Sequence, residues 1–513
     1  MKKNFTIVKK NLRKILIAFI LVALFCIYST NRDFLMSFRP YYLRSYYLSY
    51  SIKNDLFKTQ YVKDDNSKKA KSVPVLVYHG VVSKPDSKDK YNITPETFAD
   101  QMVSLKKAGY ETISMKQFFE FQENKIQLPE KSFLLTFDDG RKDSYYPTDP
   151  ILKALDFKAT IFVIANKVNN KEKFFLNKNE LTKMKNSQTW EIQPHTYDGH
   201  ELIQIDKEGR QGYFYSNKKW LSNQNRLESD SEYKTRISED FAKSKSVLKN
   251  ELSVESFAFA YPYSDYGQDA TNYKDAKNII INESLKLFPV TFRQYRDGSG
   301  YSFNYPSGEY PFKRIDAVSY KNGDGLVKKI QASSEKVIPY ESDDSINYLN
   351  LEWLRSWGQI SFNDKKIILD SSKNGNGVLA FLDGSMSWQD YSFNAEVVWE
   401  KGSDIFLVGR YVNENNYLSL HINKEFIRIE ERVDGVDHVL KEMPSNQFSA
   451  VGNYNLGLNI SGSSVTGIIN GQVIIGATGI SKNISSGGIG FKVWDKNPDN
   501  VHIELSKVKV IKV

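Results

Sequence analysis

Hydrophobic and polar positions alternate along the chain in two ways, and the change between them divides it into two regions. Over residues 73–335, short apolar runs alternate with stretches of helical spacing, which predicts βα units around a parallel sheet or barrel. Residues 345–513 instead show strand alternation with turn residues at short intervals, which predicts an all-β sandwich. The sequence therefore predicts an α/β domain followed by an all-β domain.

Apolar runs in the first region mark about seven or eight strands: PVLVYHG, GYETIS, SFLLTFDDG, KATIFVIA, WEIQPHTYDGH, FAFAYPY, LFPVTF and FKRIDAV. After the fifth run comes a polar insertion near residues 203–230, and an amphipathic helix follows it. Apolar residues recur at helical spacing in this helix and are expected to be buried: Tyr233, Ile237, Phe241, Leu248 and Leu252.

The N-terminus combines charge and hydropathy in a way that predicts membrane insertion. Residues 1–14 contain six Lys or Arg, and residues 15–31 contain no charged residue. This order predicts a cytoplasmic basic segment and a single transmembrane anchor at the cell membrane, with the rest extracytoplasmic. The alternative is a cleaved signal segment and a secreted protein. Residues 32–72 are expected to form a linker.

The composition limits the class of protein but does not identify a binding partner. A chain of 513 residues with 40% apolar and 26% charged residues is typical of a globular protein with more than one domain. The net charge of +9 is small for this length, so a solvated surface is preferred to nucleic-acid binding. Cys26 is the only cysteine and lies in the apolar N-terminal run, so the exported part has no disulfide.

Two adjacent carboxylates, Asp138 and Asp139, directly follow an apolar strand. In a parallel βα architecture the strand ends are where side chains reach a ligand, which places this pair at the mouth of the sheet or barrel. Adjacent carboxylates repel each other, and a cation relieves that repulsion while one of them stays free as a base. The alternative interpretation is an Asp-Gly turn with a helix N-cap.

The stretch HTYDGH holds two histidines, His195 and His200, five positions apart. Neither a helix nor a strand places such positions side by side, so the rings converge only if the chain curls. Asp198 and Gly199 are residue types that permit a curl. A polar loop is the alternative, but with one carboxylate the two imidazoles have the composition of a catalytic divalent-metal site with an open position.

In their order, these motifs resemble the polysaccharide deacetylase family, the NodB-homology domain of carbohydrate esterase family four. The matching phrases within about residues 73–320 are PVLVYHGV, LLTFDDG, DSYYP, KATIFVI, HTYDGH, FAFAYPYSDYG and FKRID. The resemblance implies a distorted (β/α) barrel that holds a divalent metal ion, with zinc favoured and nickel, cobalt, iron or manganese also suited. Asp138 is then the general base, and Asp139, His195 and His200 are the metal ligands.

The resemblance also implies a reaction. A water activated by the metal attacks an N-acetyl carbonyl while Asp138 takes its proton. The backbone N–H after Pro262, that of Tyr263, helps to stabilise the oxyanion. Acetate leaves, which makes the protein a hydrolase of carbon–nitrogen bonds other than peptide bonds. The spacing of HTYDGH is similar to that of biofilm-exopolysaccharide deacetylases, whereas peptidoglycan and chitin deacetylases more often have histidines four apart.

This chain departs from the family pattern at two places. The arginine that many members have before Pro-Tyr is replaced by Ala260 and Tyr261, and the histidine that acts as general acid has no counterpart. His79, at the end of the first strand, is a candidate for that acid or for a substrate contact, against a structural role. Arg314 and Asp316 are placed to orient the base or the ligands, and Arg314 and Pro262 are also candidates for substrate binding.

Residues 345–513 resemble a concanavalin-type lectin or glucanase jelly roll, as in laminin-G-like modules, on the phrases VGRYVNENNYLSLHI, IEERVDG, IINGQ and GGIGFKVW. The paired acids of family-sixteen glucanases are absent, so hydrolysis by this domain is not expected. Five of the seven tryptophans lie here and are interpreted mainly as core, with sugar stacking as the alternative: Trp353, Trp357, Trp388, Trp399 and Trp494. A carbohydrate-binding domain and a packing or docking domain both remain open.

These features together predict a membrane-anchored, metal-dependent N-deacetylase of an extracellular poly-N-acetylhexosamine, with an exopolysaccharide synthase or export machinery as a candidate partner. The alternatives are a peptidoglycan deacetylase and, of a different class, a non-catalytic carbohydrate-binding or assembly protein. The residues do not distinguish a glucosamine from a galactosamine backbone.

Overall fold

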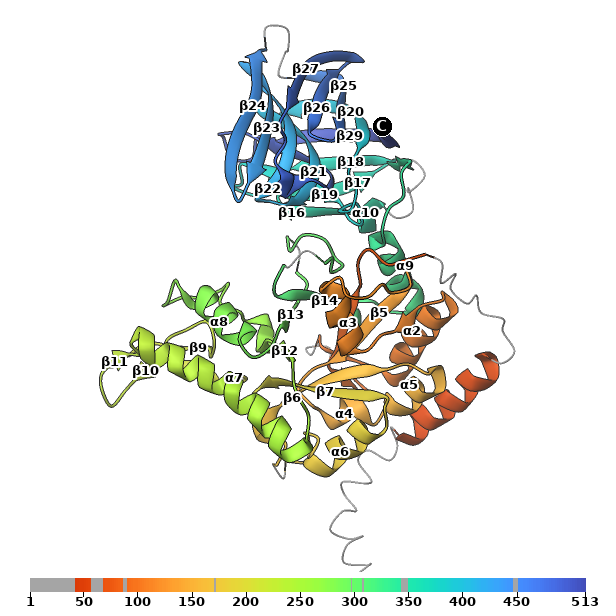
Figure 1. The fold of residues 1–513 in the computed structure, drawn as a ribbon, viewed down its shortest axis with the longest axis vertical. Helices are drawn as coiled ribbons and strands as arrows, with labels where there is room; N and C mark the ends of the chain where they lie inside the picture. The colour runs from red at the N-terminus through yellow and green to blue at the C-terminus, as the bar shows by residue number, and fades with distance from the viewer. Residues whose placement is uncertain are drawn as a thin grey trace, which may run out of the picture.

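The computed structural model describes residues 42–56, 68–85, 90–169, 172–296, 298–306, 309–342, 349–445 and 451–513. These residues form a βα barrel and a β-sandwich, with the sandwich docked at one end of the barrel beyond helix α9 (Figure 1).

The barrel wall consists of seven parallel strands in the order β12-β13-β14-β1-β5-β6-β7, and β4 also pairs with β5. Their bounds are β1 Val75–Tyr78, β4 Glu111–Thr112, β5 Ser132–Phe137, β6 Ala159–Ile164, β7 Trp190–Thr196, β12 Ala258–Ala260, β13 Val290–Gln294 and β14 Phe312–Asp316. β1, β5, β6 and β12 are buried along their whole length, because helices cover the wall outside and side chains fill it inside. The predicted parallel α/β barrel is confirmed.

Side chains bridge the gap between the two edge strands, β7 and β12. The Gln193 side-chain oxygen accepts hydrogen bonds from the backbone N–H groups of Phe257 (3.1 Å) and Ala258 (3.0 Å). The His195 ring nitrogen Nδ1 lies 2.8 Å from the carbonyl oxygen of Ala260. The barrel is therefore nearly closed, and one predicted site residue takes part in the closure.

Helices surround the barrel (Figure 1): α2 Pro95–Lys107, α3 Met115–Gln122, α4 Lys142–Tyr145, α5 Asp149–Leu155, α6 Lys178–Asn186, α7 Asp230–Leu252, α8 Ala276–Leu285 and α9 Gly323–Ser333. Short elements connect them: β2 Gly80–Val81, β3 Asn92–Ile93, β8 Leu202–Gln204, β9 Gln211–Tyr213, β10 Trp220–Leu221, β11 Arg226–Leu227, η1 Ala165–Lys167, η2 Pro262–Ser264 and η3 Ala317–Ser319. All five apolar residues predicted for the buried face of α7 are buried.

The insertion before α7, interpreted as polar, contributes apolar residues to a core that it shares with α7, α8 and β12. It folds as two small hairpins, β8–β9 and β10–β11. The ring of Tyr215 is fully buried and stacks on Phe241 of α7, with centroids 5.2 Å apart. Ile203, Ile205 and Phe214 are buried in the same cluster. Isolated apolar residues between polar ones conceal such a core in the sequence, because no regular period reveals which face they share.

The segment predicted as a linker contains a helix over residues 42–56. Ile52 and Leu56 of this helix pack on the barrel core, so these residues belong to the barrel surface. The tyrosine-rich composition of the segment hides a short apolar stripe, and this part of the linker prediction is wrong. The predicted anchor at residues 15–31 lies outside the described residues, within which no helix is long and apolar enough to cross a membrane.

The C-terminal region is all β, as predicted, and consists of two antiparallel sheets. One sheet has the order β17-β18-β29-β20-β25-β26-β27 with β15 on β29, and the other has the order β16-β19-β28-β21-β22-β23-β24. The strands are β15 Tyr340–Glu341, β16 Trp353–Trp357, β17 Gln359–Asn363, β18 Lys366–Asp370, β19 Gly377–Leu382, β20 Tyr391–Lys401, β21 Asp404–Asn413, β22 Asn416–Ile422, β23 Phe426–Val433, β24 Val436–Pro444, β25 Gly452–Ser461, β26 Ser464–Ile469, β27 Gln472–Thr478, β28 Gly488–Trp494 and β29 His502–Lys512. Two short helices, α10 Leu349–Glu352 and η5 Lys482–Ile484, complete the region.

The tryptophans of the sandwich mostly serve its core, which agrees with the main interpretation of the sequence. Trp353, Trp388 and Trp399 are buried among the apolar residues of both sheets. Trp494 at the end of β28 is 39% exposed, so one indole ring remains open to solvent.

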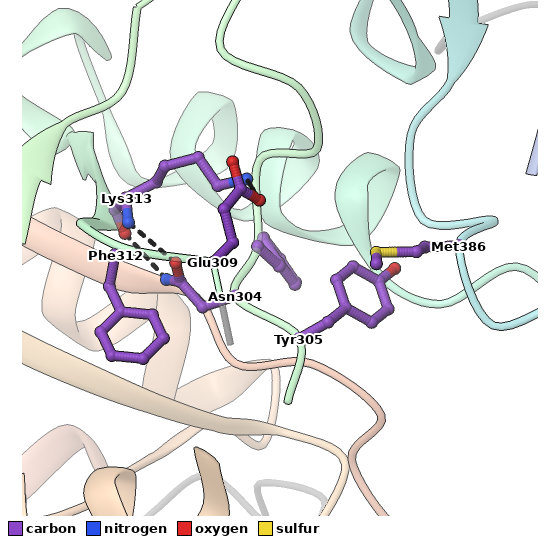
Figure 2. Close-up of a pocket in the computed structure, with 7 residues that line it drawn as sticks. Asn304, Tyr305, Glu309, Phe312, Lys313 and Met386 are labelled. Carbon is purple, nitrogen blue, oxygen red and sulfur yellow. Dashed lines mark hydrogen bonds and ion pairs between the residues drawn. The ribbon is translucent and has the colours of Figure 1, made fainter. Parts of the chain in front are cut away.

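The sandwich packs against the barrel near the N-terminal end of β14. Figure 2 shows a small pocket there, with Tyr305 of the barrel beside Met386 of the sandwich. Asn304 holds the backbone of Lys313 through two hydrogen bonds of 2.8 Å, and the buried Lys313 ammonium lies 3.3 Å from Glu309. Burial lowers the pKa of Lys313. These contacts fix β14 at the position just before Arg314.

Candidate metal and acid–base site

The predicted site residues come together at the C-terminal ends of the barrel strands. His79 follows β1, the Asp138–Asp139 pair follows β5, and His195 and His200 lie at the end of β7. A cavity of about 290 Å³ is lined by all of these side chains, together with Tyr91, Arg141, Tyr213, Tyr261, Tyr263, Ser264, Gln294, Arg296 and Arg314. The sequence prediction that these segments share one mouth agrees with this arrangement.

Asp139, His195 and His200 form a compact set of three donors. The Asp139 Oδ1 atom lies 3.2 Å from Nε2 of His200 and 3.6 Å from Nε2 of His195. One ligand atom from each residue lies within 4.8 Å of the others. Burial opposes ionisation of Asp139, but the hydrogen bond from His200 and the nearby imidazoles outweigh it and hold the pKa of this carboxyl far below its usual value.

Backbone conformation explains how Asp139 reaches this position. Both Asp139 and Gly140 have φ near +71°, a left-handed conformation that turns the chain sharply at the end of β5. A Cβ atom on Gly140 would lie 2.9 Å from the side chain of Val163, so a larger residue is excluded there. The TFDDG motif thus supplies a turn that points one carboxylate at the histidines.

His195 is held in the tautomer that a metal ligand needs. Its Nδ1 donates to the carbonyl of Ala260, which leaves the lone pair of Nε2 directed at Asp139. Burial lowers the pKa of His195 to about 4, despite the two aspartates beside it. The imidazole is therefore neutral at physiological pH, as ligation requires.

His200 is fixed by Tyr263. The Tyr263 hydroxyl donates to the backbone carbonyl of His200 at 2.9 Å and lies 3.0 Å from its Nδ1, from which it can accept a hydrogen bond. The two rings are also in contact, with centroids 4.5 Å apart. Although burial acts against it, the hydrogen bond with Asp139 raises the pKa of His200. Nε2 of His200 thus faces the same point as Nε2 of His195.

The curl of HTYDGH is organised by a residue that the sequence did not single out, Asp240 of α7. Its buried carboxylate accepts hydrogen bonds from Thr196 Oγ1 (2.8 Å) and from the backbone N–H groups of Tyr197 (3.2 Å) and Asp198 (2.6 Å). The Tyr215 hydroxyl donates to the same carboxylate at 2.5 Å. One side chain thereby determines the path of the loop between the two histidines.

Gly199 has a different role from the one expected. It does not adopt a positive φ, so conformational freedom is not the reason for glycine here. A Cβ atom at this position would lie 2.5 Å from Thr196 Oγ1 and 2.6 Å from the ring of Tyr215. Lack of space explains the glycine, and the Thr196 hydroxyl accepts a hydrogen bond from its N–H at 2.6 Å.

We expect Asp240→Asn to weaken metal binding, although Asp240 is not one of the three proposed metal ligands. The amide retains the size of the carboxylate but replaces one acceptor oxygen with a donor, so it cannot satisfy all the N–H and O–H groups around it. Affinity for a divalent metal should fall by about 10- to 100-fold, the range typical of supports of ligating residues. Calorimetric titration with Zn²⁺ measures this, and Asp230→Asn, at the exposed start of the same helix, is the control.

Asp138 forms a buried ion pair with Arg314. Two guanidinium nitrogens of Arg314 donate to the two carboxylate oxygens at 2.6 and 2.7 Å, and both side chains are almost fully buried. Burial alone would raise the pKa of Asp138, but Arg314 outweighs it and lowers that pKa. The arginine that the family pattern has before Pro-Tyr is thus supplied by β14, and the missing residue at 260–261 leaves no unpaired base.

Of the other predicted site residues, some line the cavity and others do not. His79 Nε2 is 3.8 Å from Asp138 Oδ2, and the ring contacts Tyr91. Asp316 caps η3 through the N–H of Val318. Pro262 is buried and does not line the cavity, whereas Tyr263, with φ of 57°, does.

Exposed tyrosines form a rim around the cavity, and sequence analysis missed two of them. Tyr213, from the β8–β9 hairpin, stacks on Tyr263 with centroids 4.9 Å apart, and Tyr91 lines the cavity beside His79. All three are at least 40% exposed. Tyr213 lies in the insertion, and no pattern in the sequence connects that hairpin with a site 50 residues further on.

Comparison with known proteins agrees with this geometry. A family model described as polysaccharide deacetylase matches residues 125–279, which include the carboxylate pair, both histidines and Tyr263. The barrel therefore carries a polysaccharide deacetylase domain, as the sequence motifs indicated.

Two relatives are similar to part of this chain. The poly-beta-1,6-N-acetyl-D-glucosamine N-deacetylase of Escherichia coli K12 is 25% identical over 225 residues, which cover 41% of this chain and 32% of that protein. This chain thus matches about a third of the length of that relative. The protein of the same name from Staphylococcus epidermidis is 26% identical over 224 residues, which cover 43% of this chain and 71% of that protein. Among solved structures, that of IcaB from Ammonifex degensii is 26% identical, with a TM-score of 0.36. The alignment covers 48% of this chain and 93% of the IcaB chain.

Proposed function

We propose that the polysaccharide deacetylase domain of this chain hydrolyses N-acetyl groups on an extracellular poly-N-acetylhexosamine and releases acetate. The observation that carries the proposal is the cavity in which a paired, ionised Asp138 lies beside the Asp139–His195–His200 set. A carboxylate base next to three N/O ligands with an open position is the arrangement that metal-assisted amide hydrolysis needs.

Asp138 acts as the general base in this proposal. Arg314 keeps its carboxylate ionised and in one orientation, because each carboxylate oxygen accepts a hydrogen bond from one terminal nitrogen of the guanidinium. The carboxylate takes a proton from the attacking water, and the water oxygen forms a bond to the acetyl carbon. His79, 3.8 Å from the base, is the candidate that donates a proton to the departing sugar amine.

Asp139, His195 and His200 are proposed to hold a divalent metal ion. The donor set fits such an ion, since the Nδ1 atoms of both histidines are engaged in hydrogen bonds that direct their Nε2 atoms inward. A bound divalent ion would lower the pKa of water and polarise the acetyl carbonyl. Two imidazoles and a carboxylate suit zinc, nickel, cobalt, iron and manganese, with zinc favoured. The backbone N–H of Tyr263 is the proposed second donor to the oxyanion.

The exposed rim supports a polymeric sugar as substrate. Tyr91, Tyr213 and Tyr263 offer ring faces around the cavity, and aromatic faces stack on the apolar faces of sugar rings. Arg141 and Arg296 line the same cavity and can donate hydrogen bonds to hydroxyl groups. The named activity of the two relatives makes a β-1,6-linked N-acetylglucosamine polymer the first substrate to test.

The proposal is tested with the full chain, purified in detergent and supplied in parallel with Zn²⁺, Co²⁺ and Ni²⁺. Acetate is measured after incubation with β-1,6-linked N-acetylglucosamine oligomers, with β-1,4-linked oligomers and with peptidoglycan. Faster release from the β-1,6 series supports the proposal. A preference for peptidoglycan would show that the proposed substrate is wrong, although the proposed reaction would stand. Polymer binding without acetate release from any of the three substrates would contradict the proposed activity.

The remaining parts of the chain complete the proposal. An N-terminal anchor would keep the enzyme at the outer surface of the cell membrane, near machinery that synthesises or exports the polymer. The C-terminal β-sandwich, predicted from the sequence to be concanavalin-like, is proposed to bind the polymer, with support from the exposed ring of Trp494. Its rival role as a packing partner of the barrel is favoured by the buried contacts around Tyr305 and Met386.

A further inference from the structure

The helix over residues 42–56 turns its largest side chains away from the barrel. Tyr42, Leu43, Tyr46, Tyr47 and Tyr50 are all exposed, and the last three by 54%, 71% and 66%. At 100° per residue these positions fall within about 140° of the helix circumference, so they form one continuous stripe. In Figure 1 the helix lies at the outer edge of the barrel, at the red end of the colour range.

The inner face of the same helix carries two serines next to the apolar Ile52 and Leu56. Ser45 and Ser49 are buried against the barrel, beside Ile52, and Ser49 Oγ donates to the carbonyl of Tyr46 at 2.7 Å. A surface helix normally buries its large apolar residues and exposes its small polar ones. Here two serines are buried and four tyrosines are exposed. Packing on the barrel does not explain this arrangement, because it leaves the aromatic stripe uncovered by any other described element.

We infer that this stripe lies in the interfacial region of a lipid bilayer. Tyrosine has an apolar ring and a polar hydroxyl, and it is enriched where one end of a side chain is in apolar surroundings and the other in water. Arg44 on the flank of the stripe is already paired with Glu96 of α2, so the helix is fixed to the barrel at this point. The helix would therefore orient the barrel on the membrane surface.

The chain that precedes the helix supports a bilayer as the partner. The uncharged run of residues 15–31 ends only eleven positions before Tyr42, and eleven extended residues span at most about 40 Å. This argument rests on the proposed membrane anchor. If the run spans the bilayer, the stripe lies within reach of the same surface.

The size of the stripe disfavours a second copy of this chain. Five partly exposed side chains offer on the order of 500 Å². A stable protein partner needs roughly 800 Å² from each side. A lipid surface has no such minimum, since each apolar side chain that enters the interface contributes separately.

Spin labels on the full chain test the inference. In a Cys26→Ser background, a nitroxide is attached at Tyr50→Cys in the stripe or, as a matched control, at Asp55→Cys. Asp55 is exposed on the same helix, about 140° around it from Tyr50. Each protein is reconstituted into vesicles of phosphatidylcholine and phosphatidylglycerol, and collision rates with oxygen and with a water-soluble nickel chelate are measured.

We expect the oxygen-to-nickel collision ratio at position 50 to exceed that at position 55 severalfold. Equal ratios at both positions, in protein that floats with the vesicles, would overturn the inference while the anchor stands. Protein that does not float would overturn both. Low collision rates with both reagents at position 50, together with dipolar broadening between labels, would show a second copy on the stripe and also overturn the inference. Acetate release is assayed separately, so a failed proposed function is distinguishable from a failed inference.

Discussion

Asp138→Asn is expected to lower acetate release by about 10²- to 10⁴-fold, the range that a general base contributes. The asparagine amide has nearly the shape of the carboxylate but cannot accept the proton of the attacking water. Because Arg314 lowers the pKa of Asp138, the wild-type base is ionised over the whole neutral range. The measurement is the initial rate of acetate release from the best substrate found for the wild type.

Loss of the fold must be separated from loss of the base, since breaking a buried ion pair is destabilising by roughly 3–5 kcal/mol. Metal content and the unfolding temperature of Asp138→Asn are therefore measured on the same preparation. Arg314→Met serves as a matched variant, because it breaks the same pair and keeps the carboxylate. A folded, metal-loaded Asp138→Asn that retains activity within about threefold of wild type would show that another group is the base.

His195→Ala and His200→Ala are each expected to lose the bound metal, with an affinity loss that exceeds about 100-fold, and to lose activity with it. Two remaining donors of a three-residue set cannot hold a divalent ion against water at micromolar concentrations. The effect should be larger for His195, because this residue also closes the barrel through the Ala260 carbonyl. Metal content by atomic emission after dialysis measures the loss directly.

His502→Ala is the matched control for these variants. His502 of the sandwich lies 2.7 Å from the Asp370 carboxylate, so it resembles the His200–Asp139 contact, but no second histidine joins it. Its replacement should leave the metal content unchanged. Unchanged metal content in both His195→Ala and His200→Ala would rule out the proposed donor set.

The sequence predicts the candidate metal set because its residues lie within short motifs at strand ends. Asp139 and the two histidines each belong to a stretch whose local chemistry is visible, and a parallel barrel brings the ends of strands together. The Asp138–Arg314 pair is different, since 176 positions separate the two residues and only the neighbouring places of β14, β1 and β5 in the sheet unite them. Arg314 could be named as a residue that orients the base or the ligands, but the sequence does not decide between these two partners.

Asp240 and Tyr213 show what sequence patterns do not contain. Asp240 lies among the residues of an amphipathic helix, where a buried carboxylate has the same spacing as any other inward position. Its role follows from four donors that reach it from another part of the chain. The helix over residues 42–56 was not predicted from the sequence, because its largest side chains lie on the outside and the apolar stripe that it buries is short.

The buried contacts between the sandwich and the barrel, near the N-terminal end of β14, limit how this chain can lose its sandwich in evolution. Tyr301 and Tyr305 are buried, Tyr301 donates to the carbonyl of Tyr411, and Lys329 of α9 lies 3.6 Å from the buried Asp383. A gene that ended after α9 would encode a barrel with these aromatic and charged groups uncovered. The sandwich is therefore no interchangeable appendage, and a barrel that evolves without it must first replace the residues that it covers.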